Sequence, residues 1–103
     1  MPWWCVYILR CRGGFLYTGS TNNLEKRLQD HARGTGSRFV RSRLPFVLVK
    51  TIACDSQNQA MSLESHLKML GKNRKIQMVD LNLDAAGYLT ILNKEKDGNA
   101  AKT

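Results

Sequence analysis

Five polar side chains of this sequence have the chemical character that phosphodiester hydrolysis requires. Two phenols, a guanidinium, an imidazole and a carboxylate occur in that order: Tyr7, Tyr17, Arg27, His31 and Glu64. Such hydrolysis needs a polarising metal, a cation near the non-bridging oxygens, a group that takes a proton from water and a route for protonating the leaving oxygen. The set matches these needs, although tyrosine is favoured in strands and both phenols could simply belong to the core.

The arginine and the histidine fall on the face of a predicted helix that should be buried. The i, i+3, i+4, i+7 spacing of an amphipathic helix places four residues of the segment 23–33 on one face: Leu24, Arg27, Leu28 and His31. The positions of Arg27 and His31 have two possible interpretations. Either Arg27 packs its stem at the rim and His31 is a hydrogen-bonded core residue, or both belong to a functional site.

A second predicted helix carries a carboxylate beside its apolar stripe. The stripe consists of four residues, Ala60, Leu63, Leu67 and Leu70, and Glu64 projects within or just beside it. A carboxylate beside buried surface is costly unless it is paired or metal-bound. A salt bridge to Arg27 would satisfy it without any chemistry. A hard divalent cation is the functional alternative, and Mg²⁺ suits one carboxylate best because it keeps several waters and accepts phosphate oxygens.

A hairpin must position the two tyrosines. The apolar, strand-forming segments 5–10 and 15–19 are separated by Gly13 and Gly14, which permit the positive φ angles of a tight turn. Side chains alternate between the faces of a strand, so each strand presents one tyrosine on a single face.

Capping residues mark the first helix. Asn22 can cap its amino terminus, Glu25 can reach back to that cap, and Gly34 ends the helix. The sequence therefore predicts a helix over about residues 23–33.

Further elements follow in the second half of the chain. The segment 46–52 is the best predicted strand, and Ser56 and Gln59 have the spacing of a capping box that opens a helix over about 56–70. A shorter helix over about 73–81 is expected next. The resulting order, β-β-α-β-α-α, is typical of an α+β domain.

The charge of the chain is concentrated in its first half. Lys and Arg number 16 against 8 Asp and Glu, which gives a net charge of +8 over 103 residues. Residues 1–50 hold 9 basic and 2 acidic residues. Such an excess favours polyanionic partners, either nucleic acid or an anionic membrane.

Several classes of protein are excluded by what the sequence lacks. The apolar runs are far shorter than the roughly 20 residues of a spanning helix, and the segment 1–10 does not resemble a secretory signal. We therefore expect a cytoplasmic protein. Three cysteines, Cys5, Cys11 and Cys54, form no Cys-x-x-Cys pair, so we expect reduced, packed thiols without a disulfide or a zinc site.

The order of the chemical groups resembles the GIY-YIG nucleases, specifically their small single-domain bacterial members with a UvrC-like (URI) domain. Cys5-Val6-Tyr7 stands where the family has Gly-Ile-Tyr, and Tyr17-Thr18-Gly19 stands for Tyr-Ile-Gly. The segment 21–27 resembles the family's helix start with its arginine. His31 falls four residues later, and Glu64 falls where the family has its metal-binding glutamate.

The resemblance extends over about residues 3–80 and implies a small three-stranded antiparallel sheet flanked by helices. It also implies hydrolysis with one divalent ion, Mg²⁺ or Mn²⁺, that leaves a 3′-hydroxyl and a 5′-phosphate, and it associates the chain with DNA repair. Cys5 departs from the family's first glycine. Several members carry an asparagine after the glutamate, but Asn73 lies nine residues beyond Glu64 and is left out of the predicted site.

The resemblance also implies a role for each member of the set. Glu64 would bind the metal, and Tyr7 would act as general base or orient the attacking water. Tyr17 would orient the phosphate or assist proton transfer, and Arg27 would stabilise the phosphorane charge. His31 would hydrogen-bond to a tyrosine or relay a proton.

Six basic residues are candidates for phosphate contacts, namely Arg38, Arg41, Arg43, Lys72, Arg74 and Lys75. A solvated charged face is the alternative explanation. We expect a monomeric, metal-dependent endonuclease that acts on DNA with low sequence specificity or a preference for structure. A non-catalytic nucleic-acid-binding module that retains the fold is the alternative.

The chain divides into two predicted parts. Residues 1–82 form the nuclease-like domain, and residues 83–103 form a carboxyl-terminal extension. Within the extension, 88–92 is an apolar, strand-like run of unassigned role, and 93–103 is polar enough to predict disorder.

Overall fold

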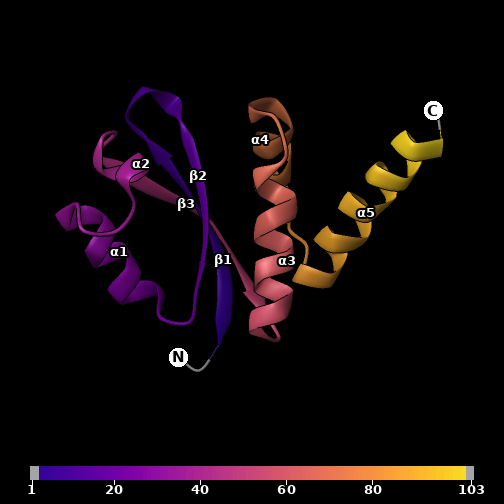
Figure 1. The fold of residues 1–103 in the computed structure, drawn as a ribbon, viewed down its shortest axis with the longest axis horizontal. Helices are drawn as coiled ribbons and strands as arrows, with labels where there is room; N and C mark the ends of the chain where they lie inside the picture. Colours follow the sequence, from indigo (N-terminus) through magenta and orange to yellow (C-terminus); the bar gives the residue numbers. More distant parts are fainter. Residues whose placement is uncertain (1–2, 102–103) are drawn as a thin grey trace.

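Three antiparallel strands form one sheet with the amino-terminal strand at its centre (Figure 1). Strand β1 (Trp4–Cys11) pairs with β2 (Leu16–Thr21) on one side and with β3 (Phe46–Cys54) on the other. The structure, a computed structural model, describes residues 3–101, with side chains described as far as Lys94. The predicted α+β class and the three-stranded antiparallel sheet are confirmed.

The turn between β1 and β2 is built as the glycine pair predicts. A short 3₁₀ turn, η1 (Arg12–Gly14), joins the strands, and Gly13 and Gly14 have φ angles of 84° and 80°. Side chains other than glycine rarely adopt such angles, so these two residues allow the sharp reversal.

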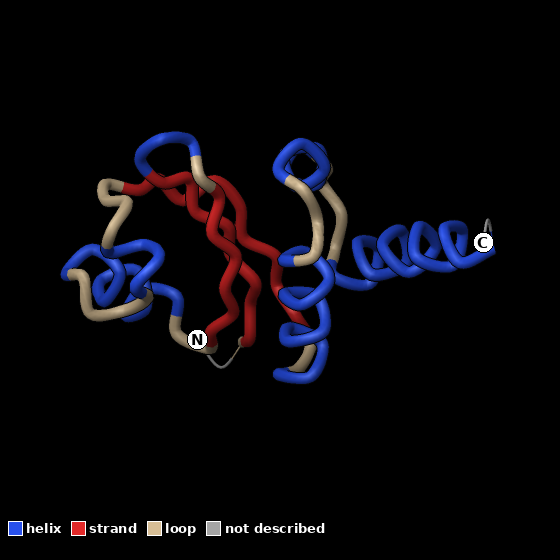
Figure 2. The backbone as a smooth tube through the Cα atoms, turned by 45° about the horizontal axis from the view of Figure 1, so that its top comes forward, coloured by secondary structure: helices blue, strands red, loops and turns tan. Residues whose placement is uncertain are grey.

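Helices cover both faces of the sheet (Figures 1 and 2). Helices α1 (Leu24–Arg33) and α2 (Arg38–Arg41) lie on one face. On the other face lie α3 (Gln57–Lys68), α4 (Lys72–Asp80) and α5 (Ala85–Ala101). The predicted helices 23–33, 56–70 and 73–81 are thus confirmed with small shifts of their ends.

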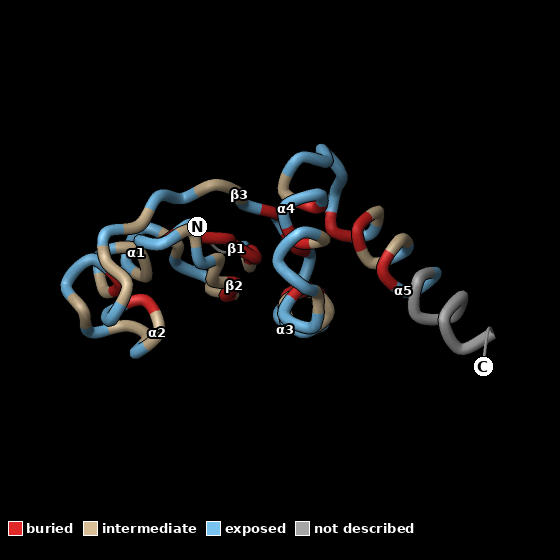
Figure 3. The backbone as a smooth tube through the Cα atoms, turned by 90° about the horizontal axis from the view of Figure 1, so that it is seen from above, coloured by how far each residue is buried: buried red, intermediate tan, exposed pale blue. Residues whose placement is uncertain are grey.

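Strand β1 supplies side chains to two separate cores. Val6 and Ile8 point towards α3 and α5, whereas Tyr7 and Leu9 point towards α1 and α2. All four are at most 1% exposed, because helices cover the central strand on both faces (Figure 3). The alternation of a β-strand therefore places Tyr7 in a different core from its immediate neighbours.

The cap of α1 differs from the prediction by one residue. Asn23, not Asn22, is the capping residue, and its Oδ1 accepts a hydrogen bond from the Lys26 backbone N–H at 3.2 Å. Both asparagines have a side chain that can cap a helix. Asn23 is the cap because the free backbone N–H of Lys26 lies three residues after it.

The predicted cap of α3 is confirmed. Ser56 Oγ accepts a hydrogen bond from the Gln59 N–H at 3.1 Å, and Gln59 Oε1 accepts one from the Asp55 N–H at 2.6 Å. The side chain of Gln59 thus reaches back as a capping box predicts, although to the residue before the cap.

The carboxyl-terminal extension is helical as far as Ala101, which corrects one prediction. The run 88–92 is not a strand but part of α5, because Ala85, Tyr88 and Leu92 recur at helical spacing and are buried in the α3 core. Helix α5 continues to Ala101, and the expected disorder of 93–103 stays a prediction. Residues 102–103 of the predicted tail lie outside the described residues.

Helix α2 was not predicted from the sequence. The basic segment that contains it forms one helical turn, in which Ser37 Oγ accepts a hydrogen bond from the Val40 N–H at 3.3 Å. Val40 is fully buried against Tyr7 and Leu9. Together with the partly buried Phe39, which packs against the same cluster, this side chain fixes the basic turn on the sheet.

The cysteines agree with the prediction, since Cys5, Cys11 and Cys54 are all buried and free. In the described part of the chain, no helix has both the length and the apolar character needed to cross a bilayer.

Candidate active site

Tyr7 and His31 form a buried pair between the sheet and α1. Tyr7 Oη and His31 Nε2 are 2.8 Å apart, and the two side chains are 1% and 0% exposed. The apolar face of α1 places His31 here, as its i+7 position from Leu24 predicts. His31 is therefore a core residue, but its bonding partner is one of the candidate phenols.

Two glycines are required by the close packing around this pair. Gly19 is the cross-strand partner of Tyr7, and a Cβ atom on Gly19 would lie 2.5 Å from Tyr7 Cζ. A Cβ atom on Gly36 would lie 2.6 Å from His31 Nδ1. The phenol thus lies across the glycine of the Tyr-Thr-Gly segment, and the connection after α1 closes over the imidazole.

Replacing Gly19 with alanine is expected to push the Tyr7 phenol out of place. Overpacking of a well-packed core costs about 1–3 kcal/mol, so the free energy of unfolding should fall by that amount in chemical denaturation. Any activity that depends on Tyr7 should fall with it. Gly71→Ala is the matched control, because nothing lies within 4 Å of the added Cβ. Equal stability of the two variants would contradict the packing argument.

Tyr17 joins the pair through ring contacts. Its ring centroid lies 6.3 Å from that of Tyr7 and 5.3 Å from that of His31, edge-on to the imidazole. The distance from Tyr17 to the Phe39 ring is 5.9 Å. Unlike Tyr7, Tyr17 is partly exposed, so it lies at the solvent side of the aromatic cluster.

Arg27 lies beside both phenols at the amino-terminal end of α1. Hydrogen bonding to Tyr7 raises the pKa of Arg27, while partial burial lowers it and the nearby Tyr17 raises it further. The guanidinium therefore stays charged next to the two hydroxyl groups. It is partly exposed, which leaves it accessible to an anion.

Glu64 approaches from the opposite face of the sheet. Its Oε1 accepts a hydrogen bond from Ser20 Oγ at 2.6 Å, and its Oε2 lies 2.8 Å from Lys68 Nζ. The salt bridge to Arg27 considered from the sequence is thus wrong, since Lys68 is the cation that pairs with Glu64. Glu64 acts on the phenols electrostatically, because its negative charge makes a small contribution to the raised pKa of Tyr7, after the larger effects of burial, Arg27 and Tyr17.

The buried pair is neutral near pH 7. Burial raises the pKa of Tyr7 to about 12, although hydrogen bonding to Arg27 opposes the shift. Burial, followed by the charge of Arg27, lowers the pKa of His31. The phenol therefore keeps its proton, and the imidazole is uncharged.

The donor set fits a hard divalent cation that is held by few protein atoms. Among the described residues, no three His, Cys, Asp or Glu side chains are grouped to hold a metal. Glu64 offers one carboxylate, whose side chain is 19% exposed. Mg²⁺ is commonly bound through one or two carboxylates together with waters and substrate phosphates, which matches this arrangement.

The candidate phosphate-binding residues fall on two faces of the molecule. Arg38 and Arg41 are exposed on α2, and the Arg43 guanidinium lies 4.0 Å from the ring centroid of Phe39 and 4.7 Å from that of Phe15. This group lies on the same face of the sheet as Tyr7 and Tyr17. It is therefore placed to contact a substrate at the phenols.

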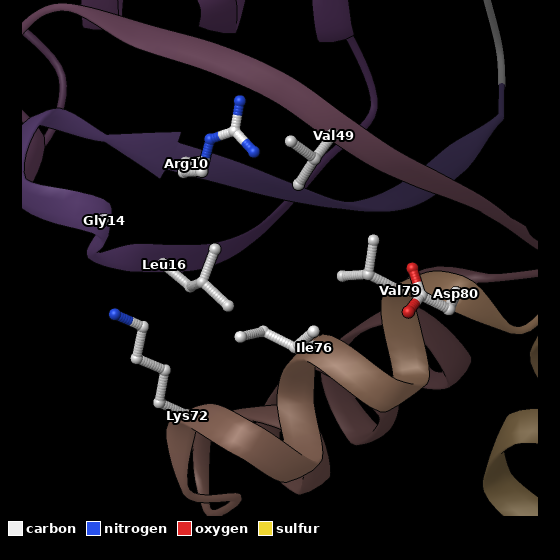
Figure 4. Close-up of a pocket in the computed structure, with 8 residues that line it drawn as sticks. All are labelled: Arg10, Gly14, Leu16, Val49, Lys72, Ile76, Val79 and Asp80. Atoms are coloured by element: carbon white, nitrogen blue, oxygen red, sulfur yellow. The ribbon is translucent and has the colours of Figure 1, made fainter.

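The second group, on α4, lies behind the sheet. Lys72 is exposed and lines a pocket of about 280 Å³ with Arg10 of β1, which Figure 4 shows between α4 and the hairpin. Arg74 donates to Gln77 Oε1 at 2.6 Å. Lys75 is only 8% exposed, and burial lowers its pKa. Only Lys72 of the three thus presents an exposed cation, and Asn73 is exposed on the same helix, outside the cluster of phenols.

Comparison with known protein families identifies the family to which this fold belongs. Residues 3–77 match the family model of the GIY-YIG catalytic domain. The chain belongs to the GIY-YIG family. Its two tyrosine-containing tripeptides lie on the paired strands of the hairpin, and each contributes one phenol to the cluster.

Small GIY-YIG relatives match most of the chain. The UPF0213 protein CPE1444 of Clostridium perfringens is 43% identical over 74 residues, which cover 72% of this chain and 80% of the relative. The UPF0213 protein BH0048 of Halalkalibacterium halodurans is 43% identical over 76 residues, covering 74% and 81% of the two chains.

A solved structure agrees with the fold. The solution NMR structure of the UPF0213 protein BH0048 from Bacillus halodurans has a TM-score of 0.53 at 41% identity and covers 78% of this chain and 85% of that chain. The protein is thus a small single-domain GIY-YIG member. Membership indicates a nuclease-type function and nucleic acid as the binding partner, while the names of the relatives specify no activity.

Sequence reasoning missed two residues of the site. Gly19 and Ser20 follow Tyr17 on β2, and they contact Tyr7 and Glu64 respectively. The signal for Gly19 was available, because a glycine in the middle of a strand often marks the close approach of another group. Ser20 carried no such signal, since its partner is 44 residues away.

Proposed function

We propose that the protein is a metal-dependent endonuclease that hydrolyses phosphodiester bonds in DNA, with low sequence specificity or a preference for structure. The observation that carries the proposal is the convergence of four groups, Tyr7, Tyr17, Arg27 and His31, beside β2, while the charge of Glu64 on α3 contributes to the raised pKa of Tyr7. A structural core has no need of so many polar groups at one place.

The Tyr7–His31 pair supplies a route for a proton. A phenol with a pKa of about 12 is protonated at neutral pH, so Tyr7 becomes a base only by giving up its own proton. His31 Nε2, 2.8 Å from Tyr7 Oη, can accept that proton while Tyr7 Oη takes one from water. The water oxygen then bonds to phosphorus as the bond from phosphorus to the 3′ oxygen breaks. The imidazole carries the proton lost by water, and the leaving 3′ oxygen takes a proton from solvent.

The charged groups complete the chemistry. Arg27 stabilises the negative charge that develops on the non-bridging oxygens, and Tyr17, at the exposed side of the cluster, orients the phosphate. A divalent cation bound at Glu64 would polarise the phosphate and lower the pKa of a bound water. The expected products are a 3′-hydroxyl and a 5′-phosphate.

The exposed arginines of α2 supply affinity without reading sequence. Contacts to phosphate position a protein on nucleic acid but do not discriminate among bases. Substituting Arg38 or Arg41 with glutamine is therefore expected to weaken binding to duplex DNA of any sequence. Each substitution should reduce the slope of log K against log salt by about 0.9, measured by fluorescence anisotropy at several salt concentrations.

The control for this measurement is Lys94→Gln, which removes an exposed charge from α5, far along the chain from the phenols. It should leave the salt slope unchanged. Equal slopes in Arg38→Gln, Arg41→Gln and the unmodified protein would show that these arginines form only a solvated face.

Incubation of the full chain with a panel of nucleic acids tests the proposed activity. Branched, nicked, single-stranded and duplex DNA, with a single-stranded RNA for comparison, are incubated with Mg²⁺ or Mn²⁺ and, separately, with EDTA. Cleavage within the DNA strands that EDTA abolishes is the expected result. Salt-sensitive binding without turnover on any substrate would instead support the alternative, a non-catalytic nucleic-acid-binding module.

A further inference from the structure

The Glu64 carboxylate is held from two sides by residues of different elements. Ser20 comes from β2, and Lys68 comes from the next turn of α3. We propose that Ser20 positions Glu64 for a divalent cation and that Lys68 is an internal counter-ion which the incoming cation displaces. The inference rests on the proposed role of Glu64 in metal binding.

Ser20 is placed to fix one carboxylate oxygen. It pairs with Val6 across the sheet, and its hydroxyl reaches Glu64 on α3. The distance of 2.6 Å from Ser20 Oγ to Glu64 Oε1 lies in the range of strong, charge-assisted O–H···O⁻ bonds. A hydroxyl has one proton to donate, so this bond fixes the orientation of Oε1 and leaves Oε2 for a cation.

Ser20 also links Glu64 to the phenols. It directly follows Gly19, the residue across which the Tyr7 phenol lies. A bond from Ser20 therefore fixes the carboxylate relative to Tyr7. Groups that orient a metal ligand in this way typically change metal affinity by about 10- to 100-fold when they are removed.

Lys68 occupies the remaining oxygen but is free to leave. Its Nζ lies 2.8 Å from Glu64 Oε2, and its side chain is 51% exposed, compared with 19% for Glu64. The ammonium can therefore swing into solvent on its flexible stem, whereas the carboxylate is held in place. Two cations on one carboxylate oxygen repel each other, so a divalent ion at Oε2 and Lys68 compete for it.

The nearby charge of Lys75 favours the release of Lys68 from Glu64. The charge of Lys68 contributes to lowering the pKa of the nearby, buried Lys75, after the larger effect of burial. Movement of Lys68 into solvent separates these like charges. Competition from Lys68 therefore lowers the affinity of Glu64 for a divalent ion but does not abolish binding.

The two residues are expected to act in opposite directions on metal affinity. Ser20→Ala should weaken Mn²⁺ binding by about tenfold or more, because Glu64 loses its fixed orientation. Lys68→Gln should tighten it by about two- to fivefold, the scale of one exposed ion pair. If the Ser20 bond were purely structural, Ser20→Ala would lower the stability of the fold. Lys68→Gln would then leave the Mn²⁺ affinity unchanged.

Titration of the full chain with Mn²⁺, followed by the electron paramagnetic resonance signal of the free ion, measures the affinity without nucleic acid. Ser20→Thr retains the hydroxyl and should restore most of the affinity. Ser65→Ala, an exposed serine on the same helix, and Lys94→Gln, an exposed lysine elsewhere, are the matched controls. Circular dichroism confirms that each variant is folded.

Equal affinities for Ser20→Ala and Ser65→Ala, or a Lys68→Gln variant that binds Mn²⁺ no more tightly than Lys94→Gln, would overturn the inference. Because Lys68 is exposed, its variant tests the counter-ion even if Ser20→Ala fails to fold. Glu64→Gln separates the two proposals. If Glu64→Gln binds Mn²⁺ as the unmodified protein does, the proposed metal site fails; if it loses binding while Ser20→Ala and Lys68→Gln have no effect, only this inference fails.

Discussion

Replacement of Glu64 with glutamine is expected to reduce metal-dependent cleavage greatly while nucleic-acid binding persists. Glutamine has nearly the same shape and still accepts a hydrogen bond from Ser20, but it lacks the negative charge that attracts a divalent ion. The loss should reach about 10²- to 10³-fold, the scale of removing one group that stabilises charge in a transition state. Initial rates on the best substrate of the panel measure it.

The binding measurement distinguishes this loss from general damage. The basic residues of α2 lie on the opposite face of the sheet from α3, so the variant should bind DNA with the affinity and the salt slope of the unmodified protein. Glu25→Gln, which removes an exposed carboxylate from the first turn of α1, is the control. Undiminished nicking by purified Glu64→Gln would overturn the proposed role of Glu64.

Substitution of Arg27 with alanine is the second large expected effect. Arg27 lies beside both phenols, with its charge maintained by them, and its loss removes the cation proposed to stabilise the non-bridging oxygens. We expect cleavage to fall by about 10²- to 10³-fold, with a salt slope for binding that changes by at most about 0.9. Arg27→Lys should recover only part of the rate, because lysine lacks the planar fork of donors.

Arg33→Ala is the matched control, since Arg33 is exposed in the last turn of the same helix. It should cleave at the unmodified rate. A full rate in Arg27→Ala would instead support the simplest sequence interpretation, in which Arg27 is an amphipathic residue at the rim of a buried helix face. Loss of activity together with loss of the folded state would also favour that interpretation.

Turn, capping and periodicity patterns in the sequence correctly predicted the structural elements that depend only on neighbouring residues. The turn glycines Gly13 and Gly14, the Ser56 cap and the helical face that contains His31 are all encoded within a few residues of where they act. The order of strands and helices followed from these signals. The roles assigned to the five candidate residues stay predictions, to be tested by the variants above.

Features that depend on distant partners were not predictable in the same way. Tyr88 and Leu92 occur in an apolar run that also suits a strand, and only packing on α3 and α4 makes it helical. Tyr88 Oη lies 2.8 Å from the Met78 carbonyl oxygen and 2.6 Å from that of Leu81, two partners set by the tertiary fold. In the same way, the choice of Lys68 over Arg27 as the partner of Glu64 depends on which side of the sheet α3 covers.

The position of β2 at the edge of the sheet has a consequence for self-association. One side of β2 pairs with β1, and an exposed edge is a general template for adding a strand from another molecule. Here Tyr17 and Gly19 belong to that edge strand, between Arg27 on one face and Glu64 on the other. An oligomer built by strand addition at β2 would therefore place a second molecule beside Tyr17, the partly exposed phenol, so this mode of assembly would compete with a substrate for access to Tyr17.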